Sequence, residues 1–245
     1  MINILIPLGN VSKFFEDTSY QYPKPLIEID SIPMIQHVIE NLSAIKRNKK
    51  FIFILRESDC ISYHLDNTIK LLLGDNVSII KISNETKGAV CSALLAIDLI
   101  NKKNESLIIA NGDQIFDLNL NKYIDRFYNE NIDAGCLCID SVHPRWSFVR
   151  LEGEKIIEAE EKNPISRNAI SGFYFFRRGS EFVESAFNMI RKDNHFNEQF
   201  FVAPVLNELI LKDLSLSAFT IPPESYHTFY SPQKIVEYEL GIWKN

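Results

Sequence analysis

The sequence predicts an α/β fold, a three-layer sandwich in which helices cover both faces of a mainly parallel central sheet. Two observations lead to this prediction. Strand-like and helix-like segments alternate along residues 1–140, an order that is typical of βαβ units. The strand-like segments are predominantly apolar, as expected of strands that are buried on both faces. The chain has 245 residues, enough for a sizeable core, and we expect one domain, residues 1–245.

Five apolar runs in the first half have the length and composition of buried strands. The first, Ile2 to Ile6, is rich in β-branched residues and stops at Pro7. Helix-like segments lie between the runs, and in the first two of them apolar residues recur at spacings of three and four. The pattern predicts strands at 2–6, 51–55, 76–82, 106–110 and 134–139, and helices at 33–46, 58–73, 89–100 and 119–130.

From residue 146 the pattern changes to a mixture of hairpin, helix and strand. The aromatic run 170–176 is strand-like, and Gly172 inside it indicates a bulge or a close approach by another group. Pro204 is expected to interrupt one of the helices. We predict a hairpin from 148–151 and 155–159, helices at 180–192, 198–212 and 232–240, and a strand at 215–221.

Composition excludes several classes of protein. The net charge of -6 provides no basic surface for nucleic acid or for an anionic membrane. No apolar run approaches the length of a membrane span, and the first residues lack the basic start of a signal peptide, so we expect a cytoplasmic protein. The four cysteines form no Cys-x-x-Cys pair and are expected in a reduced core. No histidine belongs to a recognisable nucleophile motif, so covalent catalysis has no support.

The loop after the first strand carries a lysine between two prolines. It contains one glycine, Gly9, and ends at Pro23-Lys24-Pro25. Each proline fixes its own φ and restricts the residue before it, so Lys24 is held in a defined place. A strand that leads into a loop with a fixed cation is suited to phosphate binding. The alternative is a plain surface turn, since this tripeptide is common in linkers.

Further candidate residues follow other strands. Asp113 comes directly after the apolar run 106–110 and could hold Mg²⁺, which prefers oxygen ligands; an aspartate that starts a turn is the alternative. Glu85 and Gly88 stand between a strand and a helix, where helix capping would also explain them. Glu161 and Lys162 belong to an acidic run that could equally be a solvated surface segment. Ligands bind at the carboxyl ends of the strands in such sheets.

The order of these motifs resembles that of one superfamily. Ile-Pro-Leu-Gly, Pro-Lys-Pro-Leu-Ile-Glu-Ile, Glu-Thr-Lys-Gly-Ala, Asn-Gly-Asp-Gln and Glu-Lys-Asn-Pro-Ile-Ser follow one another along nearly the whole chain. This order is similar to that of sugar-phosphate nucleotidyltransferases, above all the short members from bacterial capsule and lipopolysaccharide loci. The resemblance implies a Rossmann-like core of the nucleotide-diphosphosugar transferase type. It also implies a Mg²⁺-dependent reaction between an NTP and a phosphorylated acceptor, which releases pyrophosphate during surface polysaccharide synthesis.

The resemblance also implies roles for single residues. Residues 1–140 would form the nucleotide-binding half and residues 141–245 the acceptor-binding half. Lys24 would contact the transferring phosphate, Lys13 would stand where the superfamily has an arginine, and Asp113 would hold Mg²⁺. The implied substrate-binding residues are Leu8, Gly9, Glu85, Gly88, Asn111 and Gly112 on the nucleotide side, and Glu161, Lys162 and Gly172 around the acceptor.

Departures from the superfamily pattern leave two other functions open. The loop after Leu8 is one residue shorter than the usual glycine-rich loop and has one glycine, and no carboxylate stands at Thr228. A nucleotide-binding or regulatory homologue with a decayed site would fit these departures. A glycosyltransferase of the related fold would need an Asp-x-Asp motif, which Asn111-Gly112-Asp113 does not provide. By analogy with the superfamily we favour CTP as the NTP, and a homo-oligomer is left open.

Overall fold

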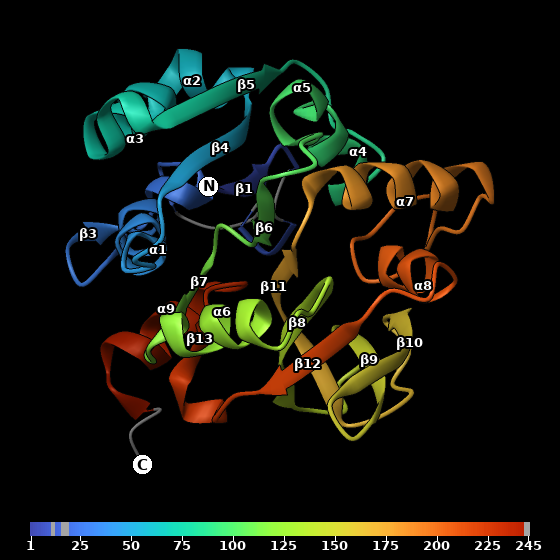
Figure 1. The fold of residues 1–245 in the computed structure, drawn as a ribbon. Coiled ribbons are helices and arrows are strands. Elements are labelled where there is room, and N and C mark those ends of the chain that lie inside the picture. The colour runs from blue at the N-terminus through green and yellow to red at the C-terminus, as the bar shows by residue number, and fades with distance from the viewer. Residues whose placement is uncertain (11–12, 16–19, 243–245) are drawn as a thin grey trace.

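The computed structural model describes residues 1–10, 13–15 and 20–242. In this part of the chain, nine strands form one sheet in the order β5-β4-β1-β6-β11-β8-β12-β10-β9 (Figure 1). Two further pairs of short strands lie outside it, β7 (Gln114–Phe116) with β13 (Tyr226–Thr228) and β2 (Glu28–Ile29) with β3 (Ile32–Pro33). The α/β fold with a mainly parallel sheet is confirmed.

The first half of the sheet is parallel. Strand β1 (Ile2–Leu8) lies between β4 (Lys49–Arg56) and β6 (Ser106–Ala110), and β5 (Val77–Ile82) flanks β4. These strands all run in the same direction because long connections with helices join them. Their carboxyl ends therefore meet at one edge of the sheet, where Leu8, Arg56 and Ala110 end their strands.

The second half extends this sheet with an antiparallel insertion. Strand β11 (Asn168–Phe176) lies between β6 and β8 (Ala134–Asp140) and is antiparallel to both. Beyond β8 follow β12 (Leu216–Thr220), β10 (Lys155–Glu161) and β9 (Ser147–Glu152), and β9 also pairs with β11. Because β11 runs the other way, its middle reaches the carboxyl end of β6.

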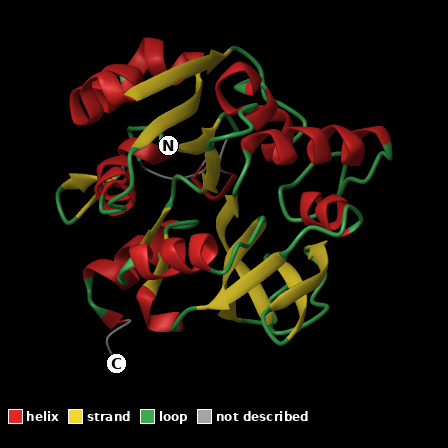
Figure 2. Cartoon of the chain, in the orientation of Figure 1, coloured by secondary structure: helices red, strands yellow, loops and turns green. Residues whose placement is uncertain are grey.

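Helices cover both faces of the sheet, and Figure 2 shows them on either side of the strands. One core contains residues of α1 (Met34–Ser43), α2 (Glu57–Tyr63), α3 (Leu65–Leu73) and α6 (Leu120–Asn129). The opposite core contains residues of α4 (Ala89–Leu94), α5 (Ile97–Ile100), α7 (Gly179–Arg191) and α8 (Val205–Ile210). In β1, Ile4 and Ile6 face the first core and Leu5 the second, as the alternation of side chains along a strand requires. Helix α9 (Pro232–Glu239) contributes Ile235 to a smaller third core, which also contains Ile29 of β2, Met34 of α1 and Ile115 of β7.

Three predicted helices are shorter than expected. The segment 58–73 breaks into α2 and α3 at His64, whose φ of 54° ends the first helix. The segment 89–100 breaks at Ala96 into α4 and α5. Of the segment 198–212, only Val205–Ile210 is helical, so the helix starts directly after Pro204. Apolar spacing continues through each break, which is why periodicity alone predicted longer helices.

The described residues contain no helix long and apolar enough to cross a membrane. All four cysteines are free. Cys60, Cys136 and Cys138 are buried, as predicted for core residues, and Cys91 is partly exposed.

Candidate functional site

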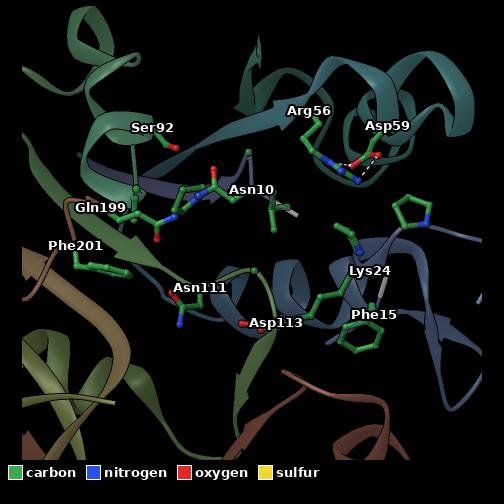
Figure 3. Close-up of a pocket in the computed structure, with 18 of the residues that line it drawn as sticks. Asn10, Phe15, Lys24, Arg56, Asp59, Ser92, Asn111, Asp113, Gln199 and Phe201 are labelled. Carbon is green, nitrogen blue, oxygen red and sulfur yellow. Dashed lines mark hydrogen bonds and ion pairs between the residues drawn. The ribbon is translucent and has the colours of Figure 1, made fainter. Parts of the chain in front are cut away.

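A cavity of about 510 Å³ opens at the carboxyl ends of β1, β4 and β6. Segments that are far apart in the sequence line it together: residues 7–10, 22–25, 88–89 and 111–113, with Phe15, Arg56 of β4, Asp59 of α2, Ser92 of α4, and Gln199 and Phe201 from the loop before α8. All three strand-end loops that the sequence singled out therefore contribute to one cavity. Figure 3 shows the side chains that surround it.

Lys24 and Asp113 form an ion pair inside this cavity, although 89 residues separate them. Their side chains are 16% and 22% exposed. Pro23 and Pro25 hold Lys24 in a short 3₁₀ turn, closed by a hydrogen bond of 2.8 Å from the Leu26 N–H to the Pro23 carbonyl. The Lys24 ammonium also lies 5.2 Å from the centre of the Phe15 ring. The expected fixed cation and the expected strand-end carboxylate thus meet.

Asp113 is held in place by its backbone as well. The Phe229 N–H donates to the Asp113 carbonyl over 2.8 Å, which ties the segment after β6 to the segment after β13. Among the described residues there is no group of three or more histidine, cysteine, aspartate or glutamate side chains that could hold a metal ion. A single carboxylate suits Mg²⁺, which is commonly bound through one or two carboxylates together with substrate phosphates and water. Asp113 fits that role. The described residues do not provide enough ligands to hold a metal by protein side chains alone.

Two glycines that line the cavity leave room for the side chains of neighbouring strands. A Cβ at Gly112 would lie 2.4 Å from the side chain of Leu8, and a Cβ at Gly9 would lie 2.4 Å from the side chain of Ile82. Leu8 therefore fills the space between the first strand and the segment after β6. Leu8, Gly9 and Gly112 are substrate-binding candidates, and they line the cavity together with Asn111.

Gly88 lies where the chain must pass close to another segment. Its φ is 100° and its ψ is 175°, a conformation that is essentially restricted to glycine. A Cβ there would lie 2.5 Å from the carbonyl oxygen of Phe200. Hydrogen bonds on both sides hold this contact: the Phe200 N–H donates to the Lys87 carbonyl (2.8 Å), and the Val90 N–H donates to the Phe200 carbonyl (3.1 Å). The loop before α8 is thereby fixed against the start of α4.

Gly172 forms the bulge that the sequence predicted in β11. Its φ is 73°, and the register between β11 and β8 shifts between Ile170 and Tyr174. The Asn111 N–H donates to the Gly172 carbonyl over 3.1 Å, and a Cβ at Gly172 would lie 2.1 Å from the Asn111 amide nitrogen. The same carbonyl accepts from the side-chain amide of Gln114 (2.9 Å). Gly172 thus packs directly against Asn111 and holds the start of the segment 111–113 by a backbone hydrogen bond.

Glu161 and Lys162 lie at the end of β10, outside the lining of the cavity. Glu161 is buried and accepts a hydrogen bond from the Ser147 hydroxyl. Burial raises the pKa of Glu161, although the Ser147 bond and the charge of Lys162 act in the opposite direction. The Lys162 ammonium lies 4.7 Å from the centre of the Phe201 ring, a cation–π distance. Since Phe201 lines the cavity, Lys162 lies next to the cavity wall.

Of two other predicted residues, Glu85 lies outside the cavity lining and the Lys13 side chain lies outside the described residues. Glu85 is exposed. Val11 and Ser12, from the same loop as Lys13, also lie outside the described residues. Between Glu85 and the cavity, the Thr86 hydroxyl donates to the Gly88 carbonyl over 3.0 Å and lies 2.6 Å from the Ser92 hydroxyl.

The sequence did not single out several residues that line the cavity. Arg56 ends β4 and could have been found by the strand-end argument that pointed to Asp113. Asp59 follows it in α2. Gln199 and Phe201 come from a loop far along the chain, and no local pattern pointed to them. Other unpredicted lining residues are Asn10, Phe15, Tyr22, Ala89 and Ser92.

The fold as a whole is similar to that of solved nucleotidyltransferases. A nucleoside-diphosphate-sugar pyrophosphorylase from Vibrio cholerae has a TM-score of 0.84 at 22% identity, over 97% of this chain and 99% of the other. An inositol-1-phosphate CTP transferase from T. maritima has a TM-score of 0.75 at 12% identity, over 99% of this chain and 96% of the other. At these identities the likeness concerns the fold. Among curated proteins, none matches the sequence significantly.

The sequence itself matches one protein family over most of its length. Residues 10–201 match the nucleotidyl transferase family, and this span contains all the segments that line the cavity except residues 7–9. The Rossmann-like fold expected from the motif order agrees with that match. The chain therefore belongs to the nucleotidyl transferase family.

Proposed function

We propose that the protein transfers a nucleoside monophosphate from an NTP to a phosphorylated small-molecule acceptor and releases pyrophosphate. The observation that carries the proposal is the Lys24–Asp113 pair, a cation and a carboxylate that face one cavity at the carboxyl ends of the parallel strands. Such an edge is where α/β sheets bind ligands. Reactions of this class need positioning and charge stabilisation and no protein nucleophile, and the absence of a nucleophile motif in the sequence agrees with this.

In the proposed reaction, a phosphate oxygen of the acceptor attacks the α-phosphorus of the NTP. The bond between the α-phosphorus and the oxygen that bridges to the β-phosphate breaks, and pyrophosphate leaves with that oxygen. Lys24 contributes a positive charge beside the reacting phosphates. Asp113 would hold Mg²⁺, whose charge neutralises phosphate oxygens. The chain's own role is to hold both reactants in line. Hydrogen bonds to the backbone carbonyls of Asp113 and Gly172 keep the segment 111–113 in place.

The two halves of the chain would divide the substrates between them. On the nucleotide side we assign Leu8, Gly9, Gly88, Asn111 and Gly112, which line the cavity; Glu85 and Lys13 stay candidates from the resemblance alone. On the acceptor side we assign Lys162 to the acceptor phosphate, with Glu161 and Gly172 around it. Lys162 suits this assignment because its ammonium is held over Phe196 (5.1 Å) and Phe201 (4.7 Å) and forms no ion pair among the described residues.

The identities of base and acceptor are proposed by analogy. One similar structure is a nucleoside-diphosphate-sugar pyrophosphorylase and another an inositol-1-phosphate CTP transferase. We propose a phosphorylated sugar or a sugar-like alcohol as the acceptor, CTP as the favoured NTP, and surface polysaccharide synthesis as the purpose.

A thermal-shift screen followed by a pyrophosphate assay tests the proposal. The four NTPs are added singly, each with Mg²⁺ and with EDTA. We expect one NTP to raise the melting temperature when Mg²⁺ is present, since a ligand that binds only the folded state stabilises it. Pyrophosphate release with a panel of sugar 1-phosphates and inositol phosphate should then depend on that NTP. Absence of any Mg²⁺-dependent NTP shift would refute the proposal, and binding without turnover would indicate a regulatory homologue.

A further inference from the structure

We propose that Arg56, oriented by Asp59, binds the phosphate groups that leave as pyrophosphate. This inference rests on the proposed function and adds a residue to it. Arg56 is the last residue of β4, the strand next to β1, and it lines the same cavity as Lys24 and Asp113.

A buried carboxylate holds the guanidinium of Arg56 in one orientation. Its Nε donates to one oxygen of Asp59 over 3.0 Å and its Nη2 donates to the other over 2.8 Å. The Asp59 side chain is 7% exposed and that of Arg56 is 27% exposed. A guanidinium has five N–H donors in a fixed planar fork, and two of them are used in this contact. The remaining donors are free to meet a second anion without breaking the pair.

The position of Arg56 in the cavity matches the place expected for a phosphate chain. Figure 3 shows Arg56, Asp59 and Lys24 on one side of the cavity, and Ser92, Gln199 and Phe201 on the other. The second side has hydroxyl, amide and aromatic groups and no cation among its described residues. An NTP that spans the cavity would meet its positive charges at the end where Arg56 and Lys24 lie. Since negative charge is concentrated on the terminal phosphates, that end suits them.

The pairing of charges distinguishes Arg56 from Lys24. Four charged side chains are found in the described lining, and they form two pairs, Lys24 with Asp113 and Arg56 with Asp59. Lys24 shares its partner with the proposed metal site. Asp59 has no second role in the cavity, so Arg56 can stay on it while it binds phosphate. A planar guanidinium also binds phosphate in a bidentate way that an ammonium cannot.

Arg56 also lies close to the start of the loop that follows β1. Strand β4 lies directly beside β1, with Leu8 opposite Leu55 in the register. The backbone of Arg56 therefore lies one residue beyond the position opposite the end of β1, at the edge where that loop begins.

A purely structural role is the competing explanation. Asp59 lies in the first turn of α2, so the pair also joins the end of β4 to that helix. A structural role would change the stability of the fold and would affect all ligands equally. A role in binding the leaving phosphates would affect the NTP and pyrophosphate, and would leave the nucleoside monophosphate unaffected.

Calorimetric titration of matched ligands separates the two explanations. The NTP that the wild type binds best, the NMP with the same base, and inorganic pyrophosphate are titrated into the wild type, Arg56→Ala, Arg56→Lys and Arg150→Ala, all with Mg²⁺. Arg150 is the control because its exposed side chain forms an ion pair of 2.8 Å with Glu158, from β9 to β10, and does not line the cavity. The melting temperature of each unliganded variant checks folding.

We expect Arg56→Ala to weaken NTP and pyrophosphate binding about 10- to 100-fold, the range for charge-assisted hydrogen bonds, and to change NMP binding less than about twofold. Arg56→Lys should lose part of that affinity, and Arg150→Ala none. Equal losses for NTP and NMP, or no loss at all, would overturn the inference. If the Arg56→Ala chain does not fold, the comparison of NTP with NMP in Arg56→Lys decides. If the wild type binds no NTP, the proposed function has failed; if it binds NTP and Arg56→Ala binds it equally well, this inference alone has failed.

Discussion

Replacing Gly88 by alanine should both destabilise the fold and close the nucleotide side of the cavity. Gly88 has a φ of 100° and a ψ of 175°, and a non-glycine residue in such a conformation costs on the order of 1–3 kcal/mol. The added methyl group would also lie 2.5 Å from the Phe200 carbonyl oxygen. Phe200 cannot easily retreat, because two backbone hydrogen bonds hold it against the segment 87–90.

The size of the effect follows from adding these two contributions. Forcing an extra methyl group into a filled space typically costs about 1–3 kcal/mol, so Gly88→Ala should lose roughly 2–6 kcal/mol in total. Gly153→Ala is the matched control. Gly153 also has a positive φ, 63°, but a Cβ there would have nothing within 4 Å, so it should lose only the left-handed penalty of about 1–2 kcal/mol.

The assay is thermal unfolding of both variants, with and without the stabilising NTP and Mg²⁺. In a chain of this size each kcal/mol corresponds to about 2–4 °C, so Gly88→Ala should melt several degrees below Gly153→Ala. It should also lose the NTP-dependent shift, because Phe200 lies between Gln199 and Phe201, which line the cavity. Equal melting temperatures for the two variants would refute the reasoning about the Phe200 contact. A full NTP shift in Gly88→Ala would refute its link to the site.

Three further predictions concern the site and its support. Lys24→Ala should lower kcat/KM for pyrophosphate release about 10²–10³-fold, as the removal of one group that stabilises charge in the transition state does in other enzymes. Asp113→Asn should abolish pyrophosphate release. A loss below tenfold for Lys24→Ala would contradict its role beside the reacting phosphates. Tyr226→Phe should lower the melting temperature, since the Tyr226 hydroxyl donates to the buried Gln114 amide oxygen (3.1 Å) and an unpaired buried acceptor costs about 1–3 kcal/mol; an unchanged melting temperature would contradict this. Burial raises the pKa of Glu161. At pH values above the ordinary pKa of a glutamate, the folded wild type therefore binds more protons than the unfolded chain, and its stability falls as the pH rises. Glu161→Gln cannot ionise, so its stability relative to the wild type should increase as the pH rises from acid to neutral. A difference in melting temperature that does not vary with pH would exclude that explanation.

The sequence predicted the fold well because its central strands are almost entirely apolar. Runs such as 51–55 and 107–110 have no polar residue to place on a solvated face, which favours central strands. The direction of β11 could not be predicted in the same way. Its aromatic run is as apolar as the parallel strands, and only the connections made by the fold decide that it lies antiparallel between β6 and β8. The break at His64 was also hidden, because a left-handed histidine leaves no signal in the apolar spacing.

The candidate site was predictable only where its residues follow strands. Lys24 follows the first predicted strand and Asp113 the fourth, and the rule that ligands meet strand ends applied to both. Arg56 obeys the same rule, but a helix follows it directly where a loop follows the other strands, so no loop motif marks it in the sequence. Gln199 and Phe201 lie 86 and 88 residues beyond Asp113 in a segment with no regular pattern. Their presence in the cavity depends on the contact between Phe200 and Gly88, which is a property of the folded chain.

The two ion pairs explain why the cavity can be neutral before substrate arrives and still favour a polyanion. Lys24 and Asp113 neutralise each other, as do Arg56 and Asp59, so neither cation is left unpaired in a half-buried space, where an isolated charge would be costly. Lys24 would leave its carboxylate only when phosphate oxygens replace it, whereas Arg56 has donors to spare. In the proposed reaction, NTP binding therefore rearranges the Lys24 pair and leaves the Arg56 pair intact. A ligand without phosphates, whatever its base, would provide no replacement for Asp113 and would leave the cavity in its neutral, paired state.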